Sequence, residues 1–200
     1  MNAAEAREIV EAARERALFA MEAMWTRFLP HVAVIRDWLA DGALGDIVTV
    51  TADHGQWFAE DAEFRLFAPE LGGGALLDLG VYPVSFASMI LGAPDRIVSI
   101  SDPAFTGVDG QTSISIVGTD ARIEIDGDFY APTTVTLIPR QGDPTRVASV
   151  HEGRGLRHQA DEVARRLAAG DRESSLMPLD ETIAIMETMD TVLAQAVQNA

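Results

Sequence analysis

The hydrophobic positions of this chain follow a helical period at its start. Asn2 and Glu5 have the spacing of a capping box, which predicts that a helix begins here. Ile9 and Val10 would form its buried stripe, and the pattern ends near Arg16. The first element is therefore expected to be an amphipathic helix.

The pattern then changes several times before residue 92. It first predicts a largely buried strand over 17–25, a helix over 30–42, and a strand with one solvent-exposed face over 47–57. An irregular loop is predicted over 60–71, followed by a helix from the glycines at 72–74 to about residue 91.

After residue 94 short segments alternate between apolar and polar residues, separated by Gly, Asp and Pro turns. They predict strands at 96–101, 111–117, 121–127, 133–139 and 145–150, followed by helices over 156–169 and 180–198. Because the strands cluster instead of alternating with helices, the predicted class is α+β, a predominantly antiparallel open sheet with helices packed on one face.

The first helix and strand stand apart from this later group of strands. They have the form of the closing α-β unit of a domain that began earlier, which would make the chain N-terminally truncated. The alternative is that they add an edge to the main sheet. The pattern alone does not decide between the two.

Composition excludes several classes of function. The formal net charge of -16 disfavours nucleic acid and anionic membrane surfaces as partners, and no apolar run is long enough to span a membrane. Without cysteine there is no disulfide, thiolate metal site or thiol nucleophile, which fits a cytoplasmic location. All fifteen basic residues are arginine, so no lysine of this chain can act as an acid or a base.

Candidate chemistry centres on Asp78 and Tyr82 in the predicted third helix. Residues four apart lie on one helix face about 6 Å from each other, so a carboxylate and a phenol could contact the same small molecule. The simpler interpretation is that Asp78 caps its own helix and Tyr82 is a core aromatic residue. Pattern alone favours this simpler interpretation.

Other candidates carry a similar ambiguity. Trp25 and Arg27 suit a pocket rim, and Arg65 lies just before the glycines, but each arginine could equally pair with one of the thirty-one acids. The glycines at 72–74 could form an anion-binding nest, or a flexible or close-packed loop that enters a helix. The loop is favoured because they do not form G-x-G-x-x-G. The four histidines lack ligand spacing, so no metal site is expected.

Several segments taken together resemble one family. E-A-M-W-T-R-F-L-P, G-A-L-G-D-I, R-L-F-A-P-E-L-G-G-G-A-L-L-D-L-G-V-Y-P-V-S-F and S-L-M-P-L-D-E-T follow the order seen in the C-terminal part of the Gfo/Idh/MocA oxidoreductases. The motif D-x-G-x-Y places the chain nearest the branch of the dimeric dihydrodiol and NADP-dependent xylose dehydrogenases.

The resemblance implies a division of the chain. Residues 1–25 would be the last helix and strand of a Rossmann domain, and residues 26–200 a C-terminal domain for substrate binding and dimerisation. The family's catalytic lysine and its G-x-G-x-x-G fingerprint would precede Met1. The cofactor of the full-length family is NAD or NADP, and the chain alone is expected to bind neither and to be inactive.

The resemblance also implies roles for single residues. Tyr82 matches the catalytic tyrosine and would relay the proton of the substrate hydroxyl. Asp78 matches the catalytic aspartate. Trp25 and Arg27 match the pocket-lining segment and would bind substrate, and Glu22, which leads into that segment, would lie at the cofactor. Arg65 is also expected to bind substrate, from its position just before the glycines.

Two functions of different classes therefore remain open. The chain is either the C-terminal part of an NAD(P)-dependent dehydrogenase of a sugar or diol, or a stand-alone non-catalytic module. Such a module would dimerise, or bind a sugar or a partner. In both cases a homodimer through the open sheet face is expected. Helices cover the other face, and the open face, expected to be rich in Thr, Ile and Val, would need a partner subunit as its cover.

Overall fold

The structure is a computed structural model of the chain, and it describes residues 2–56, 58–59, 61, 64–68, 71, 73–99 and 112–198. The chain divides into two compact units, each of which is described by itself. The first unit comprises Met1–Glu22, Gln56–Asp109 and Val163–Ala200, and the second comprises Ala23–Gly55 and Gly110–Glu162.

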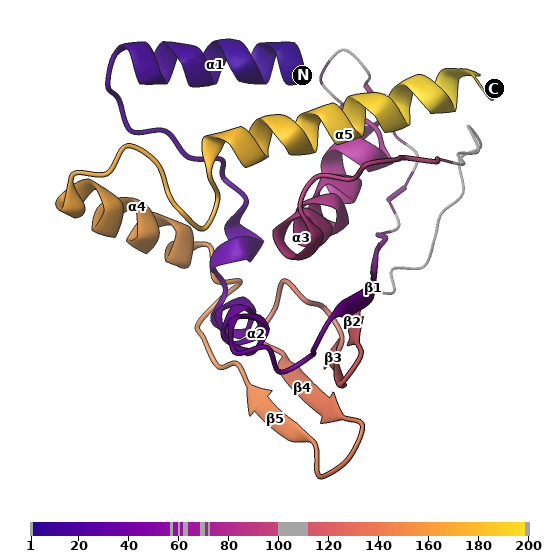
Figure 1. Cartoon of the computed structure of the whole chain (residues 1–200). Coiled ribbons are helices and arrows are strands. Elements are labelled where there is room, and N and C mark those ends of the chain that lie inside the picture. Colours follow the sequence, from indigo (N-terminus) through magenta and orange to yellow (C-terminus); the bar gives the residue numbers. More distant parts are fainter. Residues whose placement is uncertain are drawn as a thin grey trace. The chain divides into compact units, whose positions relative to one another are not determined.

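A five-stranded antiparallel sheet forms the centre of the second unit (Figure 1). Its strands are arranged in the order of the sequence, and each pairs with the next. A long connection joins the first two strands, and short connections join the others. They are β1 (Ile47–His54), β2 (Thr112–Gly118), β3 (Ala121–Ile125), β4 (Thr134–Pro139) and β5 (Thr145–Ala148).

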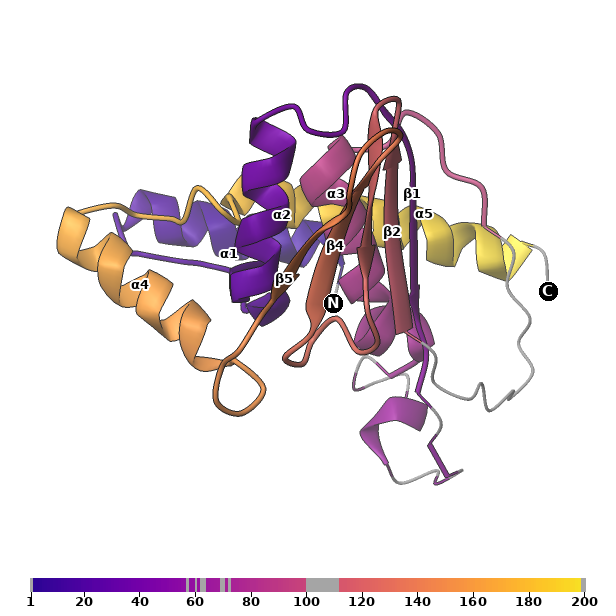
Figure 2. The ribbon, with the colours of Figure 1, turned by 90° about the horizontal axis from the view of Figure 1, so that it is seen from below.

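Alternation along the strands gives the sheet one apolar and one polar face. The apolar face carries Ile116, Ile123 and Val135, all fully buried, and the helix α2 (Pro30–Ala40) contacts its β4 and β5 side (Figure 2). Pro30 at the first helical position favours the start of α2, and its Ile35 is also fully buried. These residues form the core of the second unit.

The opposite face of the sheet is more polar than the sequence suggested. The strand register places on it Thr49, Thr51, Ser115, Val117, Arg122, Glu124, Thr136, Ile138 and Arg146. Arg122 and Glu124 form an exposed ion pair of 2.7 Å on this face. Threonine is abundant as expected, but charge takes the place of much of the expected Ile and Val.

Helices make up most of the described part of the first unit. They include α1 (Ala3–Glu15), α3 (Val81–Leu91) and α5 (Leu179–Gln198), and α5 contacts both of the others. The helix α4 (Arg157–Ala169) begins in the second unit and ends in the first. Val10 of α1, and Ile185 and Met189 of α5, are buried in this core.

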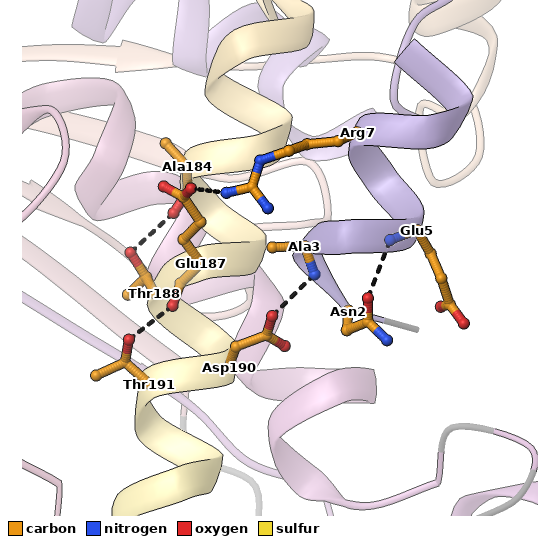
Figure 3. A network of polar contacts seen from close by, with 9 residues as sticks. All are labelled: Asn2, Ala3, Glu5, Arg7, Ala184, Glu187, Thr188, Asp190 and Thr191. Carbon is orange, nitrogen blue, oxygen red and sulfur yellow. Dashed lines mark hydrogen bonds and ion pairs between the residues drawn. The ribbon is translucent and has the colours of Figure 1, made fainter. Parts of the chain in front are cut away.

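Polar contacts join α1 and α5 in antiparallel orientation (Figure 3). The Ala3 amide donates to the Asp190 carboxylate over 2.8 Å, so an acid of α5 lies at the positive end of α1. Arg7 pairs with Glu187, and Arg14 pairs with Asp180 over 2.8 Å. Asn2 caps α1 by accepting from the Glu5 amide over 3.0 Å, as the sequence predicted.

The predicted fold class is confirmed, and so are the helices and the strands at β1–β5. Three expectations are wrong. Residues 17–24 form no strand, and Leu18 is exposed. The described part of 96–101 forms none either, because the side-chain amide of Gln195 bonds the backbone of Ile97 and Ser99 in place of a neighbouring strand. Ile9 is 68% exposed, since α1 contacts α5 through the Val10 side.

No helix in the described ranges is both long and apolar enough to cross a membrane. The predicted boundary between residues 25 and 26 stays a prediction.

Candidate functional site

Asp78 and Tyr82 lie where one kind of helix passes into another. A π-helical turn, Leu76–Gly80, carries Asp78, and α3 follows immediately with Tyr82 in its first turn. The sequence predicted one continuous helix in this region, and the structure confirms that a helix is present. The wider π-helical turn at its start was not predicted. Such insertions are frequent at functional sites. Both residues are half-buried, and they lie one turn apart along the same helical segment.

Arg65 reaches the Asp78 carboxylate from a short 3₁₀ turn, Arg65–Phe67. Its Nη2 donates to Asp78 Oδ1 over 2.6 Å, a charge-assisted hydrogen bond. The Asp78 side chain is 17% exposed, whereas that of Arg65 is 59% exposed. Asp78 is therefore a largely buried acid with a charged partner, as elementary electrostatics requires.

Glycine explains how the Arg65 turn approaches the helix so closely. A Cβ at Gly73 would lie 2.6 Å from the Arg65 carbonyl oxygen and 2.8 Å from those of Leu66 and Ala68. The Gly73 amide donates to the Ala68 carbonyl over 3.0 Å, and the Gly74 amide donates to that of Leu66 over 2.8 Å. Because both amides are engaged by the protein itself, this segment is a close-packed loop rather than an anion nest. Gly72 lies outside the described residues.

The remaining predicted residue of the first unit is Glu22. It is exposed and lies in the segment without regular secondary structure that follows α1. Its contact with a cofactor stays a prediction.

Trp25 and Arg27 belong to the second unit, on a 3₁₀ turn over Trp25–Phe28. Arg27 is only 2% exposed, and its carbonyl oxygen accepts from Arg36 Nη1 over 2.6 Å. Such burial is typical of an arginine that holds the fold together, in contrast to one at an open rim. Substrate binding by Arg27 stays untested, and Trp25 is the better candidate of the two.

An aromatic cluster surrounds Trp25. The ring of Tyr130 lies 6.4 Å from that of Trp25 and 5.2 Å from that of His54, and Phe129 lies 5.6 Å from both His54 and Tyr130. All four contacts are edge-to-face, the geometry that ring quadrupoles favour. Sequence reasoning missed Phe129 and Tyr130. The available signal was an aromatic pair inside a polar turn.

Among the residues that the structure describes, His31 has the most strongly shifted pKa. It is fully buried on α2, and its Nε2 donates to the Phe129 carbonyl oxygen over 2.6 Å. The pKa of His31 is lowered to about 4, chiefly by burial; the bond to Phe129 acts in the opposite direction, and the charge of His151 adds to the lowering. His31 is thus a neutral core residue at pH 7, next to the aromatic cluster.

No three His, Cys, Asp or Glu side chains gather as metal ligands within the part of the chain that the structure describes. A carboxylate, a phenol and a guanidinium, such as those of Asp78, Tyr82 and Arg65, are able to supply acid–base and hydrogen-bonding chemistry. Asp78, Tyr82 and Arg65 are brought together in one unit. Trp25, with its aromatic neighbours, lies in the other.

Comparison with known proteins identifies relatives over nearly the whole chain. The family model of the GFO/IDH/MocA C-terminal domain matches residues 32–134. The chain is 32% identical to the D-xylose 1-dehydrogenase (NADP(+)) of Hypocrea jecorina over 98% of its own length, and 31% identical to the trans-1,2-dihydrobenzene-1,2-diol dehydrogenase of Bos taurus over 96%. It spans 64% of the first relative and 66% of the second.

Solved structures with the same fold are more distant in sequence. The 3-ketoreductase KijD10 of Actinomadura kijaniata, in complex with NADP, superimposes with a TM-score of 0.77 at 19% identity, over 98% of this chain and 68% of that one. The aldose-aldose oxidoreductase of Caulobacter crescentus gives 0.78 at 18% identity, over 100% and 68%.

Proposed function

Because the chain belongs to the Gfo/Idh/MocA C-terminal domain family, we propose that it is the substrate-binding part of an NADP-dependent oxidoreductase acting on a sugar or diol hydroxyl. The observation that carries this proposal is the segment D-L-G-V-Y, where Asp78 and Tyr82 lie about one turn apart in one helical segment and Arg65 pairs with the acid. The names of the relatives support the choice of a neutral, hydroxyl-bearing substrate.

In this proposal Tyr82 exchanges the proton of the reacting hydroxyl. Oxidation of an alcohol releases a proton together with a hydride, so the site needs one group that accepts that proton. Asp78 orients the hydroxyl next to Tyr82, and Arg65 balances the charge of the acid. Trp25 belongs to the other unit, and its contact with the substrate is a separate part of the proposal.

We propose that residues other than those described bind most of the cofactor. A dinucleotide needs free backbone amides at a glycine turn to hold its pyrophosphate. At Gly73 and Gly74 those amides already donate to carbonyl oxygens, which would also repel phosphate. The chain offers no such cradle within its described residues. The nicotinamide supplies the hydride chemistry when a nucleotide-binding domain holds it, and Glu22 is the candidate contact.

The first test measures cofactor binding and turnover. The chain alone is expected to bind NADP(H) weakly or not at all in calorimetry. When it is fused to the nucleotide-binding domain of the Hypocrea jecorina relative, it should oxidise D-xylose or a trans-dihydrodiol with NADP⁺. Micromolar binding of NADP(H) by the chain alone would contradict the proposal that a separate nucleotide-binding domain holds the cofactor. A fusion that binds NADP⁺ but oxidises neither substrate would favour the non-catalytic module.

Assembly forms a second part of the proposal. The polar sheet face with Thr51, Ser115 and Glu124 is the surface that a second copy would cover. Light scattering at micromolar concentration is expected to give a dimer, and Ser115→Arg at the centre of this face should dissociate it. Ile9→Arg on α1 is the control and should not. A monomeric wild-type chain would contradict the proposal. A cytoplasmic location remains part of the proposal as well.

A further inference from the structure

Arg65 and Asp78 are joined more firmly than an ordinary surface ion pair. Within the described residues, Arg65 provides the hydrogen bond to the Asp78 carboxylate, over 2.6 Å, and the carboxylate is mostly shielded from water. A carboxylate with a single charge-assisted partner takes its orientation from that partner. The direction in which Asp78 presents its second oxygen therefore depends on where Arg65 is held.

The backbone fixes the place of Arg65. Its turn is tied to the start of the helix by the two hydrogen bonds of Gly73 and Gly74, and Leu66 and Ala68 of the same segment are buried. The missing Cβ of Gly73 lets the Arg65 carbonyl approach to a distance that another residue would not permit. The backbone of Arg65 is thus held in a fixed place, even though its guanidinium is partly exposed to water.

We propose that Arg65 is a positioning residue that sets the orientation of the Asp78 carboxylate relative to Tyr82. This inference rests on the proposed function, in which both residues face the substrate. It differs from the prediction that Arg65 binds substrate itself, because Arg65 then acts only through Asp78. The two possibilities give different kinetics in combined variants.

Nuclear magnetic resonance on the chain itself tests the contact without any activity. In the wild type, the Nη signals of Arg65 should be separate and slowed in rotation, and Asp78→Asn should remove this. Arg65→Gln should leave the Gly73 and Gly74 amides protected from exchange while the Asp78 side chain becomes mobile. Arg122→Gln, which removes an ion pair on the sheet whose acid is more exposed than Asp78, is the control and should change neither. Freely rotating Arg65 Nη signals in the wild type would overturn the proposal.

Kinetics on the fused enzyme test the role. Arg65→Gln is expected to lower kcat roughly 10- to 100-fold, the size of a lost hydrogen bond to a charged group, with little change in KM. In the Asp78→Asn background the same substitution should cost almost nothing further, because Arg65 has nothing left to orient. Arg65→Lys should restore part of kcat.

The alternative outcomes are distinct. A raised KM with unchanged kcat, or full additivity with Asp78→Asn, would make Arg65 a direct substrate ligand and overturn the inference. An inactive wild-type fusion would count against the proposed function, and the resonance experiment would still decide whether Arg65 orients Asp78.

Discussion

Tyr82→Phe is expected to lower kcat of the fused enzyme by roughly 10²–10⁴-fold, the usual contribution of general acid–base catalysis. The substitution removes only the hydroxyl, so the half-buried ring keeps its place in the first turn of α3. Folding should change little. The measurement compares kcat and melting temperature on the same preparations.

The simpler interpretation of Tyr82 predicts the opposite pattern. If its ring only fills space, losing the hydroxyl would cost about 1 kcal/mol of unfolding free energy and leave kcat per folded molecule normal. Asp78→Asn is the companion variant. It keeps the shape but removes the charge, and it should also lower kcat, with a smaller effect on substrate binding. A Tyr82→Phe enzyme with wild-type kcat would exclude the catalytic role.

Acid is expected to destabilise the chain through His31. Its pKa in the fold is about 4, below the ordinary value of 6.5, because burial disfavours the charged ring. Between these two values the unfolded chain binds a proton that the folded chain does not. The free energy of unfolding should therefore fall as pH drops from about 7 to 4, by about 3 kcal/mol in total from this residue, and this contribution should not change further below pH 4.

Urea unfolding across this pH range measures the effect. His31→Gln cannot titrate, so its stability should depend less on pH than that of the wild type, whatever its starting value. If the free energy of unfolding depended on pH in the same way in both proteins, His31 would not be the source of the effect. If the variant does not fold, titration of the His31 ring signals in the wild type measures the pKa directly, and an ordinary value near 6.5 would contradict it equally.

Local patterns predicted much of this fold because they carry its periodicity. In β3 the alternation of Arg122, Ile123, Glu124 and Ile125 between polar and apolar residues matches the two faces of the sheet. The strand predicted over residues 17–25 was wrong, because a hydrophobic run has the same pattern whether or not a neighbouring strand is present to pair with it. Hydrophobicity alone does not reveal the missing partner.

In the candidate site, too, the sequence predicted the local features and missed those that depend on the fold. The spacing of Asp78 and Tyr82 is local, and the sequence predicted that they share a helix. The pairing of Arg65 with Asp78 depends on a turn folded back onto Gly73, which only the three-dimensional structure reveals. The aromatic cluster around Trp25 likewise joins rings from three distant segments, so no spacing rule could have found it.

Direct transfer of hydride is the most direct test of the central claim, that this chain holds the substrate and its proton while another domain holds the nucleotide. The fused protein is given NADP⁺ and D-xylose deuterated at its anomeric carbon, and the nicotinamide product is analysed by mass spectrometry. We expect deuterium in the reduced nicotinamide with the wild type and far less, at equal time, with Tyr82→Phe. Absence of deuterium transfer in a fusion shown to bind both NADP⁺ and D-xylose would contradict the account.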